Sequence, residues 1–276
     1  MRRWLLNYWQ NLCVWHRASL RHANTIRRSR TLPLWLALIA VTLDFCLVAV
    51  WFRYSRELSI GAWTVSDVIL YLVRLGTVGV TLAWGSSHYR ISGAVAGIRP
   101  SHLFPDLRWS IKCCLIGASV IGGVVATGGA AACWLGFRPP APPALITELL
   151  RSHHWDLRHV LTFGALGVTS VVLAPVAEEL IYRSLLLPAL TCRLGLNAAV
   201  AVTAVVFGLV HVIPFGELGI PALQILGGLM MAAAFSLRWS VIPAMIVHGM
   251  GNLFVGGFCF TYVQLFEAYP SWFLPQ

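Results

Sequence analysis

The sequence predicts an all-α protein, a polytopic bundle of about seven to eight transmembrane helices. The 276-residue chain is 58% hydrophobic and only 11% charged, and its mean hydropathy is +0.75. Seven apolar segments follow one another along the chain, and most are long enough to cross about 30 Å of hydrocarbon. Arginines flank these segments and carry almost all of the net charge of +10, a distribution typical of proteins that follow the positive-inside rule.

The basic composition indicates that the protein contacts a membrane surface. Binding to nucleic acid is not expected. Arginines beside apolar segments attract anionic head groups, so membrane lipids are the expected partners. The seven cysteines lack any C-x-x-C spacing, which favours small buried residues over a disulfide framework or a zinc cage. We therefore predict an integral, multi-pass protein of a bacterial inner (cell) membrane. The sequence leaves its oligomeric state open.

Residues 1–31 are predicted to be a basic amphipathic segment on the cytoplasmic side. They contain seven arginines and no acidic residue. Apolar and aromatic residues between Trp4 and Leu12 recur at helical spacing, as expected of a helix lying in the membrane interface. A cleaved signal peptide is not expected, because the basic region is too long.

Residues 32–158 are predicted to hold the N-terminal transmembrane helices and their loops. The expected elements are a span at Leu32–Phe52, a span at Ile60–Trp84, a cytoplasmic loop at Gly85–Ser110, a span at Ile111–Phe137 and a loop at Arg138–Arg158. Asp44 in the first span could meet Arg74 in the second. The sequence assigns this pair no chemistry.

Residues 159–266 are predicted to form the helical core that carries the functional site, with residues 267–276 as a C-terminal tail. The expected spans are His159–Leu190, Asn197–Ile213, Pro221–Leu237 and Val241–Phe266. Pro175 has no backbone N–H, so we expect a kink or a freed carbonyl just before the acidic residues that follow it.

An acidic pair, Glu178 and Glu179, interrupts a long apolar run and is followed by Arg183. Carboxylates in hydrocarbon cost several kcal/mol unless they are paired or face a wet interior, so such residues are functional-site candidates. On a helix Glu179 and Arg183 are one turn apart and can pair, whereas Glu178 points about 100° away and stays available. A structural Glu–Arg clasp that holds the bundle together is the alternative.

Two later spans each carry a pair of residues at positions i and i+4. Phe207 pairs with His211, and His248 pairs with Asn252. Each pair projects from one helical face. A single intramembrane histidine is most often a packing residue. Several costly polar side chains on successive spans are best placed together around one wet cavity.

Together these groups can hydrolyse a peptide bond. Glu178 can take a proton from water, which is otherwise a poor nucleophile. His211 can hold the same water and later deliver a proton to the leaving amine. His248 and Asn252 can donate hydrogen bonds to the developing oxyanion, worth about 3–4 kcal/mol per donor in known hydrolases.

The chain resembles the CPBP family, the group of CAAX proteases and bacteriocin-processing (Abi) proteins related to the type II CAAX prenyl endopeptidases. The resemblance covers about residues 159–255 and rests on three motifs in order: Glu178-Glu179-x-x-x-Arg183, Phe207-x-x-x-His211 and His248-x-x-x-Asn252. It implies an intramembrane, glutamate-dependent endopeptidase that needs no cofactor and acts on a membrane-associated peptide or protein substrate.

The resemblance also implies a role for each motif residue. Glu178 and His211 would activate water, and His248 and Asn252 would form the oxyanion hole. The supporting residues would hold the geometry of the site: Glu179, Arg183 and Phe207.

Two other functions fit the same residues. A zinc hydrolase could use Glu178, His211 and His248 as three ligands with water as the fourth, although the H-E-x-x-H pattern is absent. A non-catalytic membrane protein, such as an immunity factor, scaffold or transporter, could use the same pairs to bind its helices together. The sequence does not name the substrate or show whether it is prenylated.

Overall fold

The computed structural model describes residues 17, 33–55, 60–89, 93, 96–98, 103–136, 157–212 and 221–268. This part of the chain contains helices and no strands, so the predicted all-α class is confirmed. The predicted N-terminal segment (residues 1–31, apart from Arg17), most of the predicted loop at 138–158 and the predicted tail from residue 269 onwards lie outside the described residues.

The helices follow one another in a simple order, and two short segments among them, η2 and η3, are π-helical. The elements are α2 (Leu34–Ser55), α3 (Ile60–Tyr89), α4 (Leu103–Trp134), α6 (Leu157–Val168), η2 (Thr169–Leu173), α7 (Ala174–Glu179), η3 (Leu180–Leu186), α8 (Leu187–Leu194), α9 (Leu196–Val212), α10 (Ala222–Arg238) and α11 (Val241–Ala268). The stretch from α6 to α8 has no break between its elements and is called the central helix below.

Within the described residues, five helices are long and apolar enough to cross a membrane. They are Leu34–Ser55, Thr64–Tyr89, Leu103–Ala131, Val160–Leu194 and Val241–Ala268. The other two, α9 and α10, are apolar but have only 17 residues each. The structure is therefore a helical bundle of an integral membrane protein, as predicted.

The predicted cytoplasmic loop at residues 85–110 is wrong at both of its ends. Helix α3 continues to Tyr89, and α4 already begins at Leu103. Asp106, which lies within the predicted loop, is buried in the first turn of α4, and its Oδ1 atom lies 3.1 Å from Nη2 of Arg238. Its charge is neutralised by another helix, which the local sequence does not reveal.

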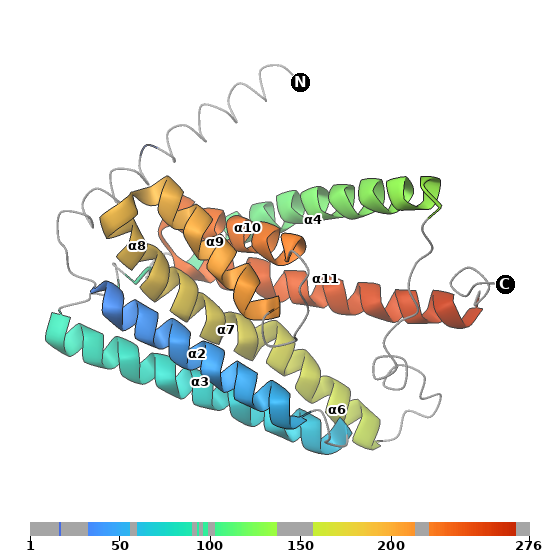
Figure 1. Cartoon of the computed structure of the whole chain (residues 1–276), viewed down its shortest axis with the longest axis horizontal. Coiled ribbons are helices and arrows are strands. Elements are labelled where there is room, and N and C mark those ends of the chain that lie inside the picture. Colours follow the sequence, from blue (N-terminus) through green and yellow to red (C-terminus); the bar gives the residue numbers. More distant parts are fainter. Residues whose placement is uncertain are drawn as a thin grey trace.

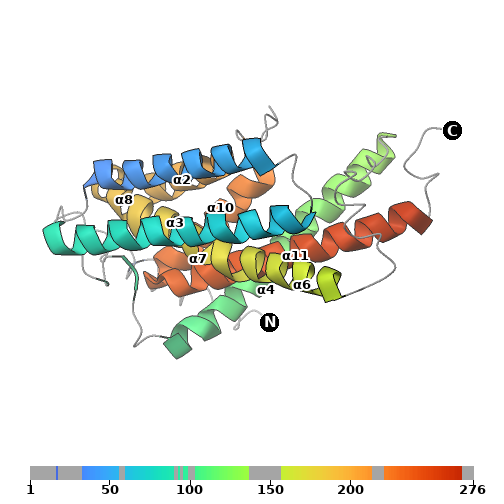
Figure 2. The ribbon, with the colours of Figure 1, turned by 90° about the horizontal axis from the view of Figure 1, so that it is seen from below.

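The central helix is surrounded by the other helices (Figure 1). Helices α2 and α3 lie side by side and contact it, while α9 and α10 form a second pair next to its C-terminal part. Helix α11 packs against α4 and against the middle of the central helix. Figures 1 and 2 show the C-terminal halves of α4 and α11 extending beyond the rest of the bundle.

The core of the bundle is the C-terminal half of the central helix. Every residue from Ile181 to Thr191 is buried. This stretch is apolar on nearly all sides, and such a helix is stable only when other helices cover it. The acidic pair directly before it is therefore held away from lipid.

The predicted freed carbonyl is found at Ser170. The N–H of Ala174 bonds to the carbonyl of Thr169, five residues earlier. The donor that would bond to Ser170 in the same π-helical pattern is residue 175, and Pro175 has no N–H. The side chain of Asn252 fills the gap, because its Nδ2 atom donates to the Ser170 carbonyl oxygen at 2.7 Å.

Helix α11 approaches this π-helical segment so closely that a glycine is needed at the contact. A Cβ atom at Gly249 would collide with the backbone carbonyl oxygen of Val171. A Cβ atom at Gly251 would meet no atom within 4 Å. Gly249 thus sets the distance at which His248 and Asn252 face the central helix.

We expect Gly249→Ala to lower the thermal stability of the purified protein, by about 1–3 kcal/mol, because overpacking against backbone forces the two helices apart. Gly251→Ala is the matched control on the same helix and should leave the unfolding temperature unchanged or slightly raised, since alanine favours helix. Thermal unfolding in detergent measures both. Equal unfolding temperatures for the two variants would contradict this account of the contact.

Candidate active site

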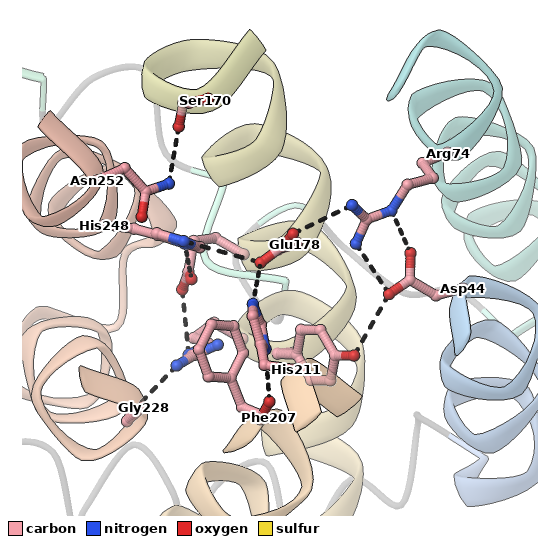
Figure 3. A network of polar contacts seen from close by, with 12 residues as sticks. Asp44, Arg74, Ser170, Glu178, Phe207, His211, Gly228, His248 and Asn252 are labelled. Atoms are coloured by element: carbon pink, nitrogen blue, oxygen red, sulfur yellow. Dashed lines mark hydrogen bonds and ion pairs between the residues drawn. The ribbon is translucent and has the colours of Figure 1, made fainter. Parts of the chain in front are cut away.

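Glu178, on the central helix, faces side chains from α3, α9 and α11, and each of its oxygens has a different set of partners (Figure 3). Its Oε1 atom accepts a hydrogen bond from Nη1 of Arg74 at 3.1 Å. Its Oε2 atom lies 3.5 Å from Nε2 of His211 and 3.7 Å from Nε2 of His248. The residue is only 5% exposed. Two of the predicted catalytic residues, His211 and His248, therefore converge on one carboxylate oxygen of a third, Glu178.

The orientation of both imidazole rings follows from what their other nitrogens contact. Nδ1 of His211 lies 2.7 Å from the carbonyl oxygen of Phe207. Nδ1 of His248 lies 2.9 Å from Oε1 of Glu179. A carbonyl and a carboxylate can only accept, so Nδ1 carries the proton in both rings. Each Nε2 atom is then directed at Glu178.

Phe207 packs against the site as predicted. Its ring centroid is 4.3 Å from that of His211 and 5.6 Å from that of His248. Phe207 itself is buried. Its ring and its backbone carbonyl both contact His211 and so help to orient the imidazole.

The predicted pairing of Glu179 with Arg183 is confirmed. Nε of Arg183 lies 3.1 Å from Oε2 of Glu179, and neither side chain is exposed. Nη2 of Arg183 also donates to the carbonyl oxygen of Gly228 in α10 at 3.1 Å. The guanidinium lies over the ring of Phe207, 4.8 Å from its centroid. Arg183 thus neutralises Glu179 while Glu179 orients His248.

Asn252 lies one turn beyond His248 on α11, beside the other predicted catalytic residues (Figure 3). It is partly exposed. One hydrogen of its amide bonds to the carbonyl of Ser170, which leaves the second hydrogen for another acceptor. The structure therefore gives Asn252 a role in joining α11 to the central helix.

Sequence reasoning missed the contribution of the N-terminal helices. Asp44 and Arg74 do meet, as considered, with Nε of Arg74 2.6 Å from Oδ1 of Asp44. Arg74 also contacts Glu178, although the spacing of the motif predicted that Glu178 would remain available. The sequence did offer one sign of this contact. Arg74 lies within an apolar span, and an arginine in the membrane is costly unless it has an acidic partner.

The described residues contain no group of three or more His, Cys, Asp or Glu side chains arranged to hold a metal ion. The three side chains considered as zinc ligands (Glu178, His211 and His248) do converge. A dication among them would lie close to the guanidinium of Arg74, and like charges repel strongly in a medium of low dielectric constant.

The fold and the cluster define an integral membrane protein with a buried polar site. Residues 161–254 match the family model of the Rce1-like type II CAAX prenyl endopeptidases. This match supports assigning residues 161–254 to the CPBP (CAAX protease) family and, in general, a CAAX-type intramembrane protease. No curated protein and no solved structure gives a significant match.

The matched segment covers only part of the site. It begins in α6 and ends in α11, and it contains all seven residues that the sequence predicted for the site. Helices α2, α3 and α4 lie outside it. Arg74, which contacts Glu178, therefore comes from a part of the chain that the family model does not cover.

We expect Arg183→Met to destabilise the protein by about 3–5 kcal/mol, because it leaves the carboxylate of Glu179 buried without its partner. Arg193→Met is the matched control, since Arg193 lies on the same central helix but is exposed. Thermal unfolding in detergent should show a large loss for the first variant and little change for the second. An unfolding temperature that Arg183→Met leaves unchanged would contradict the assigned role.

Proposed function

We propose that the protein is a glutamate-dependent intramembrane endopeptidase that hydrolyses peptide bonds of membrane-associated peptide or protein substrates. The observation that carries this proposal is the convergence of Nε2 of His211 and Nε2 of His248 on Oε2 of Glu178. No hydrogen-bond donor among the described residues reaches this buried oxygen. A buried acceptor of this kind calls for a partner, and a nucleophilic water would serve as one.

Glu178 and His211 have the geometry to activate that water. As the water oxygen attacks the carbonyl carbon of the substrate, its proton passes to Oε2 of Glu178, and the carbonyl electrons move onto oxygen. The electrons on oxygen then re-form the carbonyl as the C–N bond breaks, and the proton held by Glu178 passes through Nε2 of His211 to the leaving amine. The side chain of His211 is 32% exposed, against 6% for that of Glu178. His211 is therefore the group best able to carry this proton to a substrate.

His248 and Asn252 are the proposed donors to the oxyanion. The bond from Nδ1 of His248 to Glu179 fixes the direction of the ring. Asn252 retains one amide hydrogen beyond its bond to Ser170. A donor aimed at a developing oxyanion contributes about 3–4 kcal/mol when the site excludes water.

The charge of the cluster supports a donor role for an imidazole. Among the side chains of the cluster that contact one another, the carboxylates outnumber the guanidiniums by one: Asp44, Glu178 and Glu179 against Arg74 and Arg183. Since an uncompensated charge is costly in a medium of low dielectric constant, one extra proton on the two imidazoles would bring the cluster to neutrality. A cationic imidazole presents an N–H at both nitrogens and can stabilise an oxyanion.

We also propose a bacterial inner-membrane location with the N-terminus on the cytoplasmic side. The seven arginines among residues 1–31 support this orientation. The membrane lipids and a membrane-associated substrate are the proposed partners.

Glu178→Gln should lower the rate of substrate cleavage by about 10²–10⁴-fold, because the amide cannot accept the proton of water. His211→Ala should show a loss of similar size. The substrate for this assay is found by comparing the termini of membrane proteins in cells that produce the wild-type or the Glu178→Gln protein. Glu267→Gln, the same change outside the site on α11, should cleave normally. Wild-type cleavage by Glu178→Gln would remove the basis of the proposal.

Treatment with a chelator separates the glutamate mechanism from the zinc alternative. We expect the purified enzyme to keep its activity after chelation. An activity that is lost on chelation and restored by added zinc would favour the metal-dependent version. Motif variants that unfold, instead of folding normally without activity, would favour the non-catalytic alternative.

A further inference from the structure

The guanidinium of Arg74 ties α2 and α3 to the proposed catalytic glutamate (Figure 3). Its Nε and Nη2 atoms donate to the two carboxylate oxygens of Asp44, at 2.6 and 3.0 Å. Its third nitrogen, Nη1, donates to Oε1 of Glu178 at 3.1 Å. One planar group therefore connects residues from three different helices. The two hydrogen bonds to Asp44 fix the plane of the guanidinium, and this plane sets the direction from which Nη1 meets Glu178.

Arg74 is enclosed by side chains of its own helix and of two others. Arg74 is 3% exposed and Asp44 is 2% exposed. The hydroxyl of Tyr182 donates to Oδ2 of Asp44 at 3.3 Å, and the ring of Tyr71 lies 4.7 Å from the guanidinium carbon. Asp44 therefore holds Arg74 from one side while an aromatic ring covers its face. These contacts restrain the guanidinium within the bundle.

Arg74 determines which way the carboxylate of Glu178 faces. A glutamate side chain turns about several bonds and does not by itself keep one oxygen directed at a substrate. With Oε1 held by Arg74, the Oε2 atom faces both imidazoles. Apart from these imidazoles, Arg74 is the cationic side chain that contacts Glu178 in the described part of the chain. The contact also compensates the charge of a base that must stay ionised in order to act.

We propose that Arg74 is a positioning residue, supplied by α3 and held by Asp44 of α2, that orients Glu178 for the hydrolytic step. This inference rests on the proposed function. It assigns a catalytic purpose to α2 and α3, which lie outside the segment that the family model matches. Asp44 acts through Arg74 and not on the substrate.

Two variants test the proposal. Arg74→Lys keeps the charge, but a single ammonium cannot reproduce the planar fork that serves Asp44 and Glu178 together. The double variant Asp44→Asn/Arg74→Gln removes one charge of each sign, so the net charge of the core is unchanged. We expect kcat to fall about 10–100-fold in both, with KM within about twofold of wild type, because misplacing a reacting group by about 1 Å costs up to 10²-fold in rate.

Asp106→Asn is the matched control for the loss of a buried ion pair. Asp106 is 1% exposed and pairs with Arg238 at 3.1 Å, but neither residue contacts Glu178. This variant breaks a comparable link between two helices and should keep the wild-type kcat. Size-exclusion chromatography and thermal unfolding establish the folded fraction of each variant, and rates are expressed per folded molecule.

Glu178→Gln is assayed in parallel so that the two proposals can fail separately. If Glu178→Gln cleaves like wild type, the proposed function is wrong. If Glu178→Gln is inactive while Asp44→Asn/Arg74→Gln keeps the wild-type kcat, the positioning role is overturned and the protease remains. An equal fall in kcat for Asp106→Asn also overturns it, because any broken helix contact would then have the same effect.

A measurement without catalysis gives an independent test. Contact between Arg74 and Glu178 predicts that the stability losses of Arg74→Gln and Glu178→Gln are not additive in the double variant. The same cycle between Arg74→Gln and Asp106→Asn should be additive, because those residues share no partner. Additive losses in the first cycle would overturn the inference.

Discussion

Ionised side chains in the middle of an apolar bundle must neutralise one another, and this constraint organises the centre of the protein. Glu179 is matched by Arg183, and Asp44 shares Arg74 with Glu178. Because none of these charges is stable alone in a medium of low dielectric constant, the helices that carry them are held in one register. The same pairing that stabilises the bundle leaves one oxygen of Glu178 facing two imidazoles. The contacts that hold the helices together therefore also arrange the candidate site.

The irregular backbone of the central helix also helps to hold the helices in register. Pro175 removes the donor that the Ser170 carbonyl would otherwise use in the π-helical pattern, and Asn252 supplies a replacement from α11. Gly249 lets the two backbones approach. In the motif His248-x-x-x-Asn252, therefore, Gly249 allows the helices to approach, Asn252 satisfies a backbone carbonyl, and His248 reaches the carboxylates. A motif that reads as purely catalytic also specifies how two helices dock.

The family match and the site have different boundaries. The matched segment, residues 161–254, contains the glutamates, the histidines and the asparagine. The guanidinium that holds the oxygen of Glu178 comes from α3, and the carboxylate that holds the guanidinium comes from α2. The site formed by the motif residues is thus completed by α2 and α3, whose sequences carry no recognisable motif. A single arginine at a suitable depth in α3 is enough to make the contact with Glu178.

The sequence by itself determined the helical class, the apolar spans from α2 to α11, the pairing of Glu179 with Arg183, and the convergence of Glu178 with His211 and His248. These follow from local periodicity and from the cost of polar groups in lipid, both of which are visible in a single chain. Only the tertiary structure decided that Arg74 contacts Glu178, that Asp106 is buried against Arg238, and that Asn252 bonds to Ser170. Each of these contacts joins helices that are distant along the chain, and spacing within one helix cannot indicate which face of another it will meet.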